Sequence, residues 1–325
     1  MSLRIGVIGI GVHGLHHVRL LSSMKDISFA GVYDIDSEAG KKVACEFQIS
    51  SYDSLDHLID NVDCMTVAVP TSKHRDVVMH CLEKGKSVLV EKPVASNVSE
   101  AMDMIAQAEK RGLVLAVGHL ERFNPAYRSV GARQSLKPAF IESHRLAVFN
   151  PRGTDVAVVL DLMIHDIDVV LDMVKKPVKN VNASGVAVVT DEVDIANARI
   201  EFEGGCVANL TASRISQKKM RKIRTFQKNS YISMDFLTGE SEIFTLTNSG
   251  RPEGFAGALP QIMAGISYNK ITNDGLNALE LELADFIAAV RYGKKPCVTG
   301  NDGMKALEVA SMIMRSMEVT ARSLE

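Results

Sequence analysis

Two short stretches of the sequence hold residue types that can move a proton. The first is Glu91-Lys92-Pro93, which follows an apolar run. A lysine placed there can donate a hydrogen bond to a substrate hydroxyl or carbonyl, and its charge can stabilise a developing alkoxide. The alternative is a lysine on an exposed loop, which is the commonest environment for this residue type.

The second stretch is DLMIHDID, from Asp161 to Asp168. On a helix Asp161 and His165 are four residues apart and share a face, as do His165 and Asp168. A carboxylate beside an imidazole fixes its tautomer and raises its basicity, which is typical of a general base near neutral pH. Two alternatives are a surface histidine with ordinary ion pairs and a metal site. The metal site is the weaker one, because the sequence shows no third clustered ligand.

A glycine-rich motif, GIGVHG, follows the first apolar run. In a βαβ unit Gly9 permits a tight turn, Gly11 lets the backbone approach a pyrophosphate, and Gly14 lets helix and strand pack closely. The N–H groups at the start of the helix then face the phosphates. The alternative is a glycine-rich turn that binds no ligand.

The segments around this motif have the order that a βαβ unit needs. A strand is expected over residues 3–8, a helix over 14–24, and a second strand over 29–33 that ends at Asp34. This carboxylate lies 20 residues past Gly14, where it can accept hydrogen bonds from ribose hydroxyls and repel a 2′-phosphate. The sequence therefore favours NAD over NADP, although an arginine or lysine elsewhere can accommodate a phosphate.

Strands and helices continue to alternate up to residue 120. Strands are expected over residues 64–69, 87–90 and 114–117, and helices over 73–84 and 99–111. Repeated units of this kind need right-handed crossovers and form a parallel sheet covered on both faces. Ligands of such sheets bind at the carboxyl ends of the strands. We therefore expect the chemistry at three strand ends, namely Pro70-Thr71, Glu91-Lys92-Pro93 and Gly118-His119.

The pattern changes after Phe123-Asn124-Pro125, where extended segments begin to dominate. Strands are expected over residues 140–149, 178–189, 196–202, 206–213, 220–226, 231–236 and 243–246. They predict a largely antiparallel sheet that is open on one face or used for dimerisation. One helix is expected over 156–174, a loop over 250–275, and amphipathic helices over 276–291 and 303–322.

These patterns divide the chain into two domains. Residues 1–120 are predicted to form an α/β Rossmann domain with a doubly wound parallel sheet that binds NAD. Residues 121–325 are predicted to form an α+β domain for substrate binding and dimerisation, with a large, mostly antiparallel, open-faced sheet.

The composition agrees with a globular protein of this size. The chain has 325 residues, of which 46% are hydrophobic and 23% are charged. No apolar run reaches the ~18 residues that a membrane span needs, and the N-terminal glycines are not typical of a secretory signal. A net charge of -2 gives no reason to expect nucleic acid as a partner.

Cysteine and histidine usage gives no sign of a metal site. The five cysteines are far apart and include no C-x-x-C pair, which argues against a zinc ribbon or disulfide framework and fits a reducing cytoplasm. His13, His16 and His17 are expected to belong to the first helix and its surroundings. The basic run from Lys218 to Arg224 favours a solvated strand over a phosphate-binding or partner-binding patch.

Taken together, the motifs resemble those of the Gfo/Idh/MocA oxidoreductase family. GIGVHG, Asp34, VAVPTSKH, VEKPV, GHLERFNP and DLMIHDID occur in that family's order, and the likeness covers the whole chain. The resemblance implies that Lys92 relays a proton or positions a hydroxyl, that His165 is the acid/base, and that Asp161 is its companion. It also implies a cis peptide bond before Pro93 and a dimer or tetramer formed through the second sheet.

The motifs and the resemblance also give the expected binding residues for NAD. They are Gly9, Gly11, Val12, His13, Gly14, Asp34, Pro70, Thr71, His74, Glu91, Lys92 and His119.

Longer segments, including GHLERFNPA and DIANARIEFEGGCVANLTASR, resemble family members that oxidise the C3 hydroxyl of UDP-N-acetylglucosamine. The resemblance implies that the keto product supplies an aminotransferase of lipid A biosynthesis. A diphosphate substrate needs cationic clamps, so the substrate-binding candidates are Arg122, Arg145 and Arg152, together with Asn124.

Two alternative functions stay open at this point. The first is a family member that acts on another sugar, on a polyol or on a different nucleotide sugar, since one scaffold serves many substrates. The second is a non-catalytic NAD(P)-binding redox sensor. It is disfavoured because a sensor needs neither Lys92 nor His165.

Overall fold

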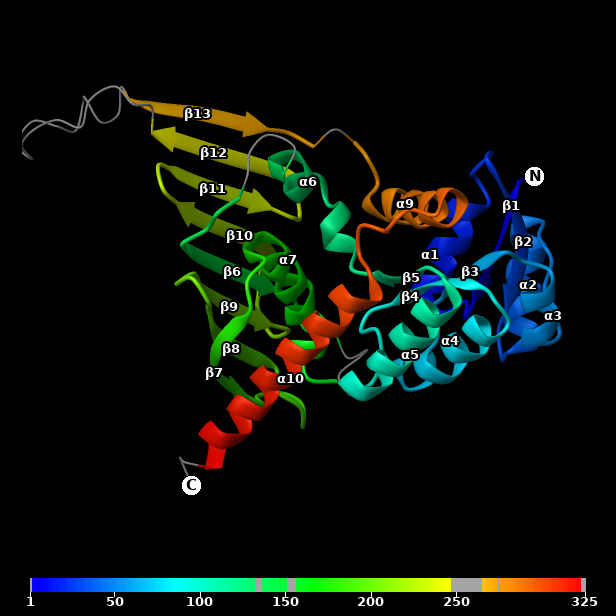
Figure 1. The fold of residues 1–325 in the computed structure, drawn as a ribbon. Coiled ribbons are helices and arrows are strands. Elements are labelled where there is room, and N and C mark those ends of the chain that lie inside the picture. Colours follow the sequence, from blue (N-terminus) through cyan, green and yellow to red (C-terminus); the bar gives the residue numbers. More distant parts are fainter. Residues whose placement is uncertain (1, 132–135, 151–155, 247–264, 274, 323–325) are drawn as a thin grey trace, which may run out of the picture. The chain divides into compact units, whose positions relative to one another are not determined.

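The computed structural model describes the chain apart from residues 1, 132–135, 151–155, 247–264, 274 and 323–325. Its contacts form two compact units, whose elements are labelled in Figure 1. Unit 1 holds Met1–Leu120 and Asn277–Glu308, and unit 2 holds Glu121–Leu276 and Val309–Glu325. Among the described residues, no helix has the length and apolar character needed to cross a membrane.

Unit 1 is built on a five-stranded parallel sheet, as the sequence predicts. The strands lie in the order β2-β1-β3-β4-β5. Their bounds are β1 (Leu3–Ile8), β2 (Ile27–Tyr33), β3 (Cys64–Val67), β4 (Ser87–Glu91) and β5 (Leu115–Gly118). Since β1 lies between β2 and β3, the strand order reverses there, and ligands of such sheets bind at the carboxyl ends beside the reversal.

Helices cover both faces of this sheet. Figure 1 shows α1 (Val12–Leu21) and α9 (Ala278–Tyr292) on one face, with α4 (His74–Glu83) and α5 (Val98–Arg111) on the other. Strand residues such as Val7 are buried in one apolar cluster with side chains of α1 and α9. The prediction of a doubly wound sheet is therefore confirmed.

Two further helices, α2 (Ser37–Phe47) and α3 (Leu55–Asp60), follow β2 and precede β3 along the sequence. Neither was predicted. Each begins at a polar side chain that caps it. Asp36 accepts hydrogen bonds from two N–H groups of α2, and Ser54 accepts one from α3. These caps supply acceptors for N–H groups that the first turn of a helix leaves without partners.

The helix α9 belongs to unit 1, whereas the sequence-based division assigned residues 277–308 to the second domain. Leu283, Phe286 and Ile287 lie on one face of α9 and are buried in the cluster around β1. Thr299, directly before α10 (Gly300–Arg322), forms a β-bridge with Ala116 of β5. Apolar periodicity shows that a helix is amphipathic but not which sheet it covers, so the sequence alone does not give this placement.

Unit 2 is built on an eight-stranded sheet in the order β13-β12-β11-β10-β6-β9-β8-β7. Every neighbouring pair is antiparallel except β6 and β9, so the predicted, mostly antiparallel sheet is confirmed. The strands are β6 (Phe140–Leu146), β7 (Val178–Val186), β8 (Ile195–Phe202), β9 (Val207–Ser213), β10 (Met220–Gln227), β11 (Ser230–Asp235), β12 (Glu240–Leu246) and β13 (Ile266–Ile271).

The helices of unit 2 pack on one face of this sheet. The β6 residues that face α7 (Ile164–Val174) are buried, and those between them are half-buried. On the same face, Ser241 of β12 donates a hydrogen bond to a carbonyl of α6 (Pro125–Gly131), and Ser316 of α10 accepts one from β7. The alternation along β6 thus separates a helix-covered face from an opposite face.

The opposite face carries a row of aromatic rings from five neighbouring strands. Ring centroids of successive neighbours lie 4.8–5.8 Å apart along the row Phe140, Phe226, Tyr231, Phe244 and Tyr268. Residues directly opposite each other in an antiparallel sheet share a face, so this row follows from the strand register.

The strand β13 lies within the segment predicted as a loop over residues 250–275, so that prediction is wrong for these six residues. Five of the six are exposed because β13 is an edge strand of the sheet. An edge strand exposed on both faces lacks the apolar alternation from which a strand is predicted. The rest of that segment lies partly outside the described residues.

The helix predicted over residues 156–174 consists of α7 and, before it, a π-helical turn over Val159–Met163. The N–H of Val158, directly before this turn, donates to the carbonyl of Val193 at 3.0 Å. Single π-helical turns are rare in proteins, and those that occur are often found at functional sites.

Replacing Phe286 with alanine should destabilise the protein by about 3–5 kcal/mol, because the ring is 1% exposed and its loss leaves a cavity. Tyr292 ends the same helix and is 63% exposed, so Tyr292→Ala is the matched control and should cost less than about 1 kcal/mol. Urea unfolding followed by circular dichroism measures both variants. Equal losses would contradict the packing of α9 in this core.

Candidate functional site

The turn between β1 and α1 leaves no room for a side chain at two of its three glycines. Gly9 has a φ of 84°, and a Cβ there would lie 2.7 Å from the Ala68 carbonyl oxygen. A Cβ on Gly14 would lie 1.9 Å from the Gly9 carbonyl oxygen, whereas a Cβ on Gly11 meets nothing within 4 Å. Gly9 and Gly14 therefore close the turn, and Gly11 leaves space in which a ligand can approach the backbone.

The helix α1 begins without a capping side chain. Gly11 is at the N-cap position, and no acidic residue lies in the first turn. The N–H groups of this turn therefore meet no acidic side chain, and the helix dipole adds positive potential there. Such a helix start suits an anionic group such as a pyrophosphate.

Asp34 follows β2 and is hydrogen-bonded to this turn. Its Oδ2 accepts from the Ile10 N–H at 2.8 Å, and its Oδ1 accepts from the Asp36 N–H at 2.9 Å. The two backbone bonds fix the carboxylate, and each of its oxygens has a further acceptor position. Asp34 can therefore still accept hydrogen bonds from ribose hydroxyls.

Two exposed apolar side chains flank these groups. Val12, which was predicted to contact the cofactor, is 67% exposed, and Ile35, which was not predicted, is 95% exposed. A planar apolar group such as adenine would remove water from such side chains. An apolar residue directly after the acid that follows β2 is the sequence signal that could have identified Ile35.

These groups fit a dinucleotide such as NAD. The glycine turn and the start of α1 would hold its pyrophosphate, Asp34 a ribose, and Val12 with Ile35 an apolar ring. His13 lies in the first turn of α1, as predicted. When bound, NAD supplies a nicotinamide ring that accepts a hydride.

The Glu91-Lys92-Pro93 segment begins at the end of β4, and its Lys92–Pro93 peptide bond is cis, as predicted. Oε1 of Glu91 lies 3.1 Å from Nε2 of His17, and Oε2 accepts from the Lys92 N–H at 3.3 Å. Burial alone would raise the pKa of the Glu91 carboxyl, but the hydrogen bond and charge of His17 hold that pKa below its usual value. Glu91 is therefore an anion whose two oxygens already face protein groups.

His74 was predicted to bind the cofactor, and its contacts in the structure disfavour this role. The ring is buried, with Nδ1 2.9 Å from the Pro93 carbonyl oxygen and Nε2 2.9 Å from the Val69 carbonyl oxygen. Both ring nitrogens thus face the backbone of unit 1. The sequence shows that a histidine follows a strand end, but not that two carbonyl groups enclose its ring.

The other predicted residues of unit 1 also lie at strand ends. Pro70 is exposed and Thr71 half-buried in the turn after β3, and His119 is buried after β5. The structure thus brings these residues to the carboxyl edge of the parallel sheet, where cofactors bind in folds of this kind.

In unit 2, the predicted catalytic pair lies where the π-helical turn passes into α7. Asp161 and His165 are both half-buried, whereas Met163, Ile164 and Asp166 are buried. The pair therefore lies on the more accessible side of this segment. A half-buried imidazole with a carboxylate four residues before it suits proton transfer.

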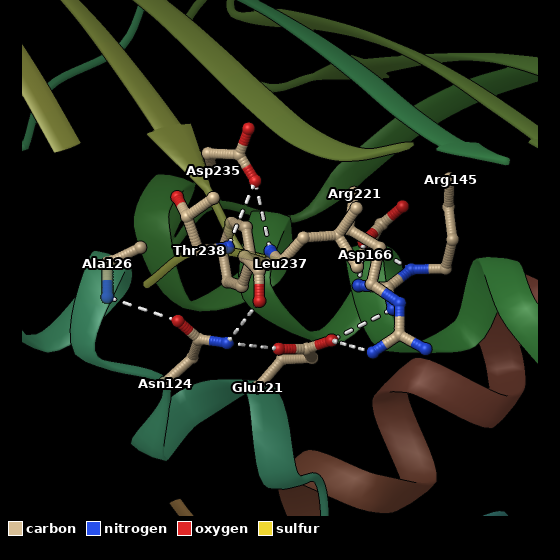
Figure 2. A network of polar contacts seen from close by, with 10 residues as sticks. Glu121, Asn124, Ala126, Arg145, Asp166, Arg221, Asp235, Leu237 and Thr238 are labelled. Carbon is tan, nitrogen blue, oxygen red and sulfur yellow. Dashed lines mark hydrogen bonds and ion pairs between the residues drawn. The ribbon is translucent and has the colours of Figure 1, made fainter. Parts of the chain in front are cut away.

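Asp166 anchors α7 to β6 through buried ion pairs (Figure 2). Its Oδ1 accepts from Arg145 at 2.9 and 2.6 Å, and its Oδ2 accepts from the Ser143 hydroxyl at 2.8 Å. Arg145 also donates to Oε1 of Glu121 at 2.8 Å. Burial opposes the charge of Arg145, but the two carboxylates raise the pKa of its guanidinium above its usual value, so it stays cationic.

Glu121 joins this ion pair to the turn between β11 and β12 (Figure 2). Its Oε2 accepts from the Asn124 amide at 2.9 Å, and the same amide donates to the Phe236 carbonyl at 3.0 Å. The Asn124 carbonyl oxygen accepts from the Ala126 N–H at 3.1 Å. Arg221, whose side chain is 48% exposed, lies 3.8 Å from Oε1 of Glu121.

A second buried arginine binds two more acids of α7. Arg122 donates to Asp168 at 2.6 and 2.9 Å, and its Nη1 lies 2.9 Å from Oδ1 of Asp172. The Tyr127 hydroxyl also donates to Asp172. Three acids of α7 are therefore each held by an arginine from another part of unit 2.

This geometry disfavours three of the four predicted substrate-binding residues. Arg122 and Arg145 direct their guanidinium groups to buried carboxylates, and the Asn124 amide binds protein groups on both sides. Their polar atoms are thus directed to the protein rather than to a diphosphate. The fourth, Arg152, lies outside the described residues.

Comparison with known proteins gives matches over nearly the whole chain. The model of an oxidoreductase family with an NAD-binding Rossmann fold (Gfo/Idh/MocA) matches residues 3–119, and the model of the Gfo/Idh/MocA C-terminal domain matches residues 139–228. UDP-N-acetylglucosamine 3-dehydrogenase of Acidithiobacillus ferrooxidans is 34% identical over 318 residues, which cover 98% of each chain. A solved structure of that enzyme has a TM-score of 0.89 at 32% identity and covers 98% of this chain and 99% of its own. The scyllo-inositol 2-dehydrogenase (NAD(+)) of Bacillus subtilis is 26% identical over 95% of this chain and 92% of that relative.

Gly11→Ala should preserve the fold but weaken dinucleotide binding. The added methyl group meets no protein atom within 4 Å, so the free energy of unfolding should change by less than about 0.5 kcal/mol. The methyl group would occupy the space of the pyrophosphate, and we expect at least about a tenfold loss of NAD affinity by calorimetry. Gly131→Ala is the control, because a Cβ there also meets nothing within 4 Å. Unchanged affinity in Gly11→Ala would contradict this placement of the pyrophosphate.

Arg145→Met should destabilise the protein by about 3–5 kcal/mol, because it leaves the buried carboxylates of Asp166 and Glu121 without their counter-charge. Arg221→Met, at a half-exposed guanidinium near the same Glu121, should cost less than about 1 kcal/mol. Urea unfolding followed by circular dichroism measures both. Equal losses in the two variants would contradict this account.

Proposed function

The chain belongs to the Gfo/Idh/MocA oxidoreductase family, and we propose that it oxidises the C3 hydroxyl of UDP-N-acetylglucosamine to a ketone with NAD as the hydride acceptor. The assignment of the substrate rests on the similarity to the Acidithiobacillus ferrooxidans enzyme over nearly the full length of both chains. The inositol dehydrogenase is a more distant relative by identity. Asp34 favours NAD over NADP, because its fixed carboxylate would repel a 2′-phosphate.

The proposed chemistry assigns one step to each catalytic side chain. Oxidation of an alcohol removes a hydride from carbon and a proton from the hydroxyl. In this proposal the imidazole of His165 takes the hydroxyl proton, and Asp161 orients the imidazole and stabilises its cation. The ammonium group of Lys92 donates a hydrogen bond to the same oxygen, which stabilises the developing alkoxide.

The diphosphate of the substrate needs cationic partners that are not already bound to buried carboxylates. Of the predicted substrate-binding residues, Arg152 therefore remains our candidate. A guanidinium can bind a phosphate through two parallel hydrogen bonds, which also fixes the orientation of the substrate.

We further propose that the protein is a homodimer or homotetramer that associates through the open face of the unit 2 sheet. The aromatic row on that face supports this, because a contiguous row of rings offers apolar area that a second copy can cover.

The proposed reaction belongs in the cytoplasm. All five cysteines lie in the described part of the chain, none of them is in a disulfide, and three are buried. Thiols persist in a reducing compartment. The 3-keto sugar formed is a carbonyl compound that an aminotransferase can convert to a 3-amino sugar, and in this proposal that product serves lipid A biosynthesis.

The test supplies the protein with NAD and UDP-N-acetylglucosamine, follows the absorbance of reduced cofactor, and traps the ketone with an aminotransferase for mass spectrometry. We expect ketone formation, and a loss of kcat of about 10²- to 10⁴-fold in Lys92→Ala and in His165→Ala. Lys110→Ala on α5 is a control at an exposed position, and His80→Ala on α4 is one at a half-buried position. NADP and a panel of free sugars, inositols and other nucleotide sugars are tested in parallel.

The other outcomes separate the alternatives. Turnover of an inositol or free sugar without any trapped ketone from UDP-N-acetylglucosamine would show that the substrate is different. Full activity of Lys92→Ala would contradict the mechanism. Cofactor binding without turnover of any substrate in the panel would favour a redox sensor.

A further inference from the structure

Two buried histidines of unit 1 contact the residues on either side of Lys92. His17 comes from α1, directly after the glycine turn, and His74 from the start of α4. Both rings are almost completely buried, and neither was expected to act on Lys92. His17 reaches Glu91, and His74 reaches Pro93.

The contact on the first side runs through the Glu91 carboxylate. Nε2 of His17 lies 3.1 Å from Oε1 of Glu91, and the other carboxylate oxygen accepts from the Lys92 N–H at 3.3 Å. Nδ1 of His17 is buried and has no hydrogen-bond partner among the described residues. The hydrogen bond to Glu91 therefore orients this ring. Glu91 in turn accepts a hydrogen bond from the amide of Lys92.

The contact on the second side runs through two carbonyl groups. Nδ1 of His74 lies 2.9 Å from the Pro93 oxygen, and Nε2 lies 2.9 Å from the Val69 oxygen. A neutral imidazole donates to one of these acceptors and an imidazolium donates to both. The ring therefore lies between the Pro93 carbonyl, next to Lys92, and the Val69 carbonyl after β3. It is hydrogen-bonded to one of them in its neutral form and to both in its protonated form.

We propose that His17 and His74 are positioning residues for catalysis, which together fix the backbone from which the Lys92 side chain extends. This inference rests on the catalytic role proposed for Lys92. A lysine side chain is a flexible four-carbon chain, so its ammonium group is placed accurately only if the backbone of the residue is fixed in position. A displacement of about 1 Å in a catalytic group can cost about a hundredfold in rate.

The first test measures hydrogen exchange at the Lys92 amide and needs no substrate. The full chain is labelled with ¹⁵N-lysine, and the Lys92 signal is identified by its absence in Lys92→Arg. His17→Leu removes the donor to Glu91, and we expect the Lys92 amide to exchange at least about tenfold faster. His74→Leu should act in the same direction.

Two controls separate a local effect from general loss of stability. His80→Gln changes a histidine of α4 that binds Asp56, away from Lys92, and should leave the exchange rate within about twofold. The Lys86 amide, which donates to the Cys81 carbonyl at 3.0 Å, is observed in the same spectra. Its exchange should be unchanged in both leucine variants.

The second test measures turnover of UDP-N-acetylglucosamine with NAD. In His17→Leu and His74→Leu we expect kcat to fall about 10- to 100-fold, while KM and the Kd for NAD change less than about threefold. Glutamine at position 17 keeps an N–H donor for Glu91, so His17→Gln should recover most of the lost kcat. A role in stability alone would not produce this split between kcat and KM.

Three results would overturn the proposal. They are unchanged Lys92 exchange in both leucine variants, equal acceleration at Lys86, and faster Lys92 exchange with an unaltered kcat. If the wild-type protein does not turn over this sugar, the proposed function fails. The effect of His17 and His74 on the backbone of Lys92 is still tested, because the exchange experiment needs no substrate.

Discussion

Burying an arginine away from water costs several kcal/mol unless carboxylates and hydrogen bonds compensate its charge. Arg145 meets this requirement with Asp166 and Glu121, and Arg122 meets it with Asp168 and, at the edge of the buried region, Asp172. Removing one partner leaves an uncompensated charge, so the segments that carry these groups have one favourable alignment. That alignment fixes α7 against β6 and against the segment that follows Leu120.

A buried charge that needs compensation also anchors the chain before the proposed catalytic residues Asp161 and His165. Asp194 is fully buried, and although burial alone would raise its pKa, three backbone N–H groups hold the pKa well below its usual range. The donors belong to Val188, Val189 and Thr190. The neighbouring Val193 accepts from Val158 at the start of the π-helical turn. The half-buried Asp161 and His165 therefore lie on a segment that is anchored before and after them.

How far the sequence predicts these features depends on the distance between interacting residues. The glycine turn and Asp34 were predictable because their partners lie within one βαβ unit. The roles of Arg145 and Arg122 were not, because Asp166 is 21 residues from the former and Asp168 is 46 residues from the latter. A sequence shows that an arginine is cationic but not which carboxylate it meets.

Amphipathic helices and edge strands escape prediction for a related reason. The apolar face of α9 predicts burial, but only the folded chain shows that it meets the parallel sheet. The exposed edge strand β13 has no buried face from which to predict it.

The place of α9 in the sequence has a consequence for synthesis on the ribosome. The stretch Glu121–Leu276 is made between the parallel strands and α9, which takes on the order of 10 s. During that interval the nascent sheet lacks Leu283, Phe286 and Ile287, so the apolar surface around β1 stays uncovered. The parallel strands thus belong to a unit that completes its core only after Glu121–Leu276 has been made. A chaperone that shields apolar surface would find its substrate in that interval.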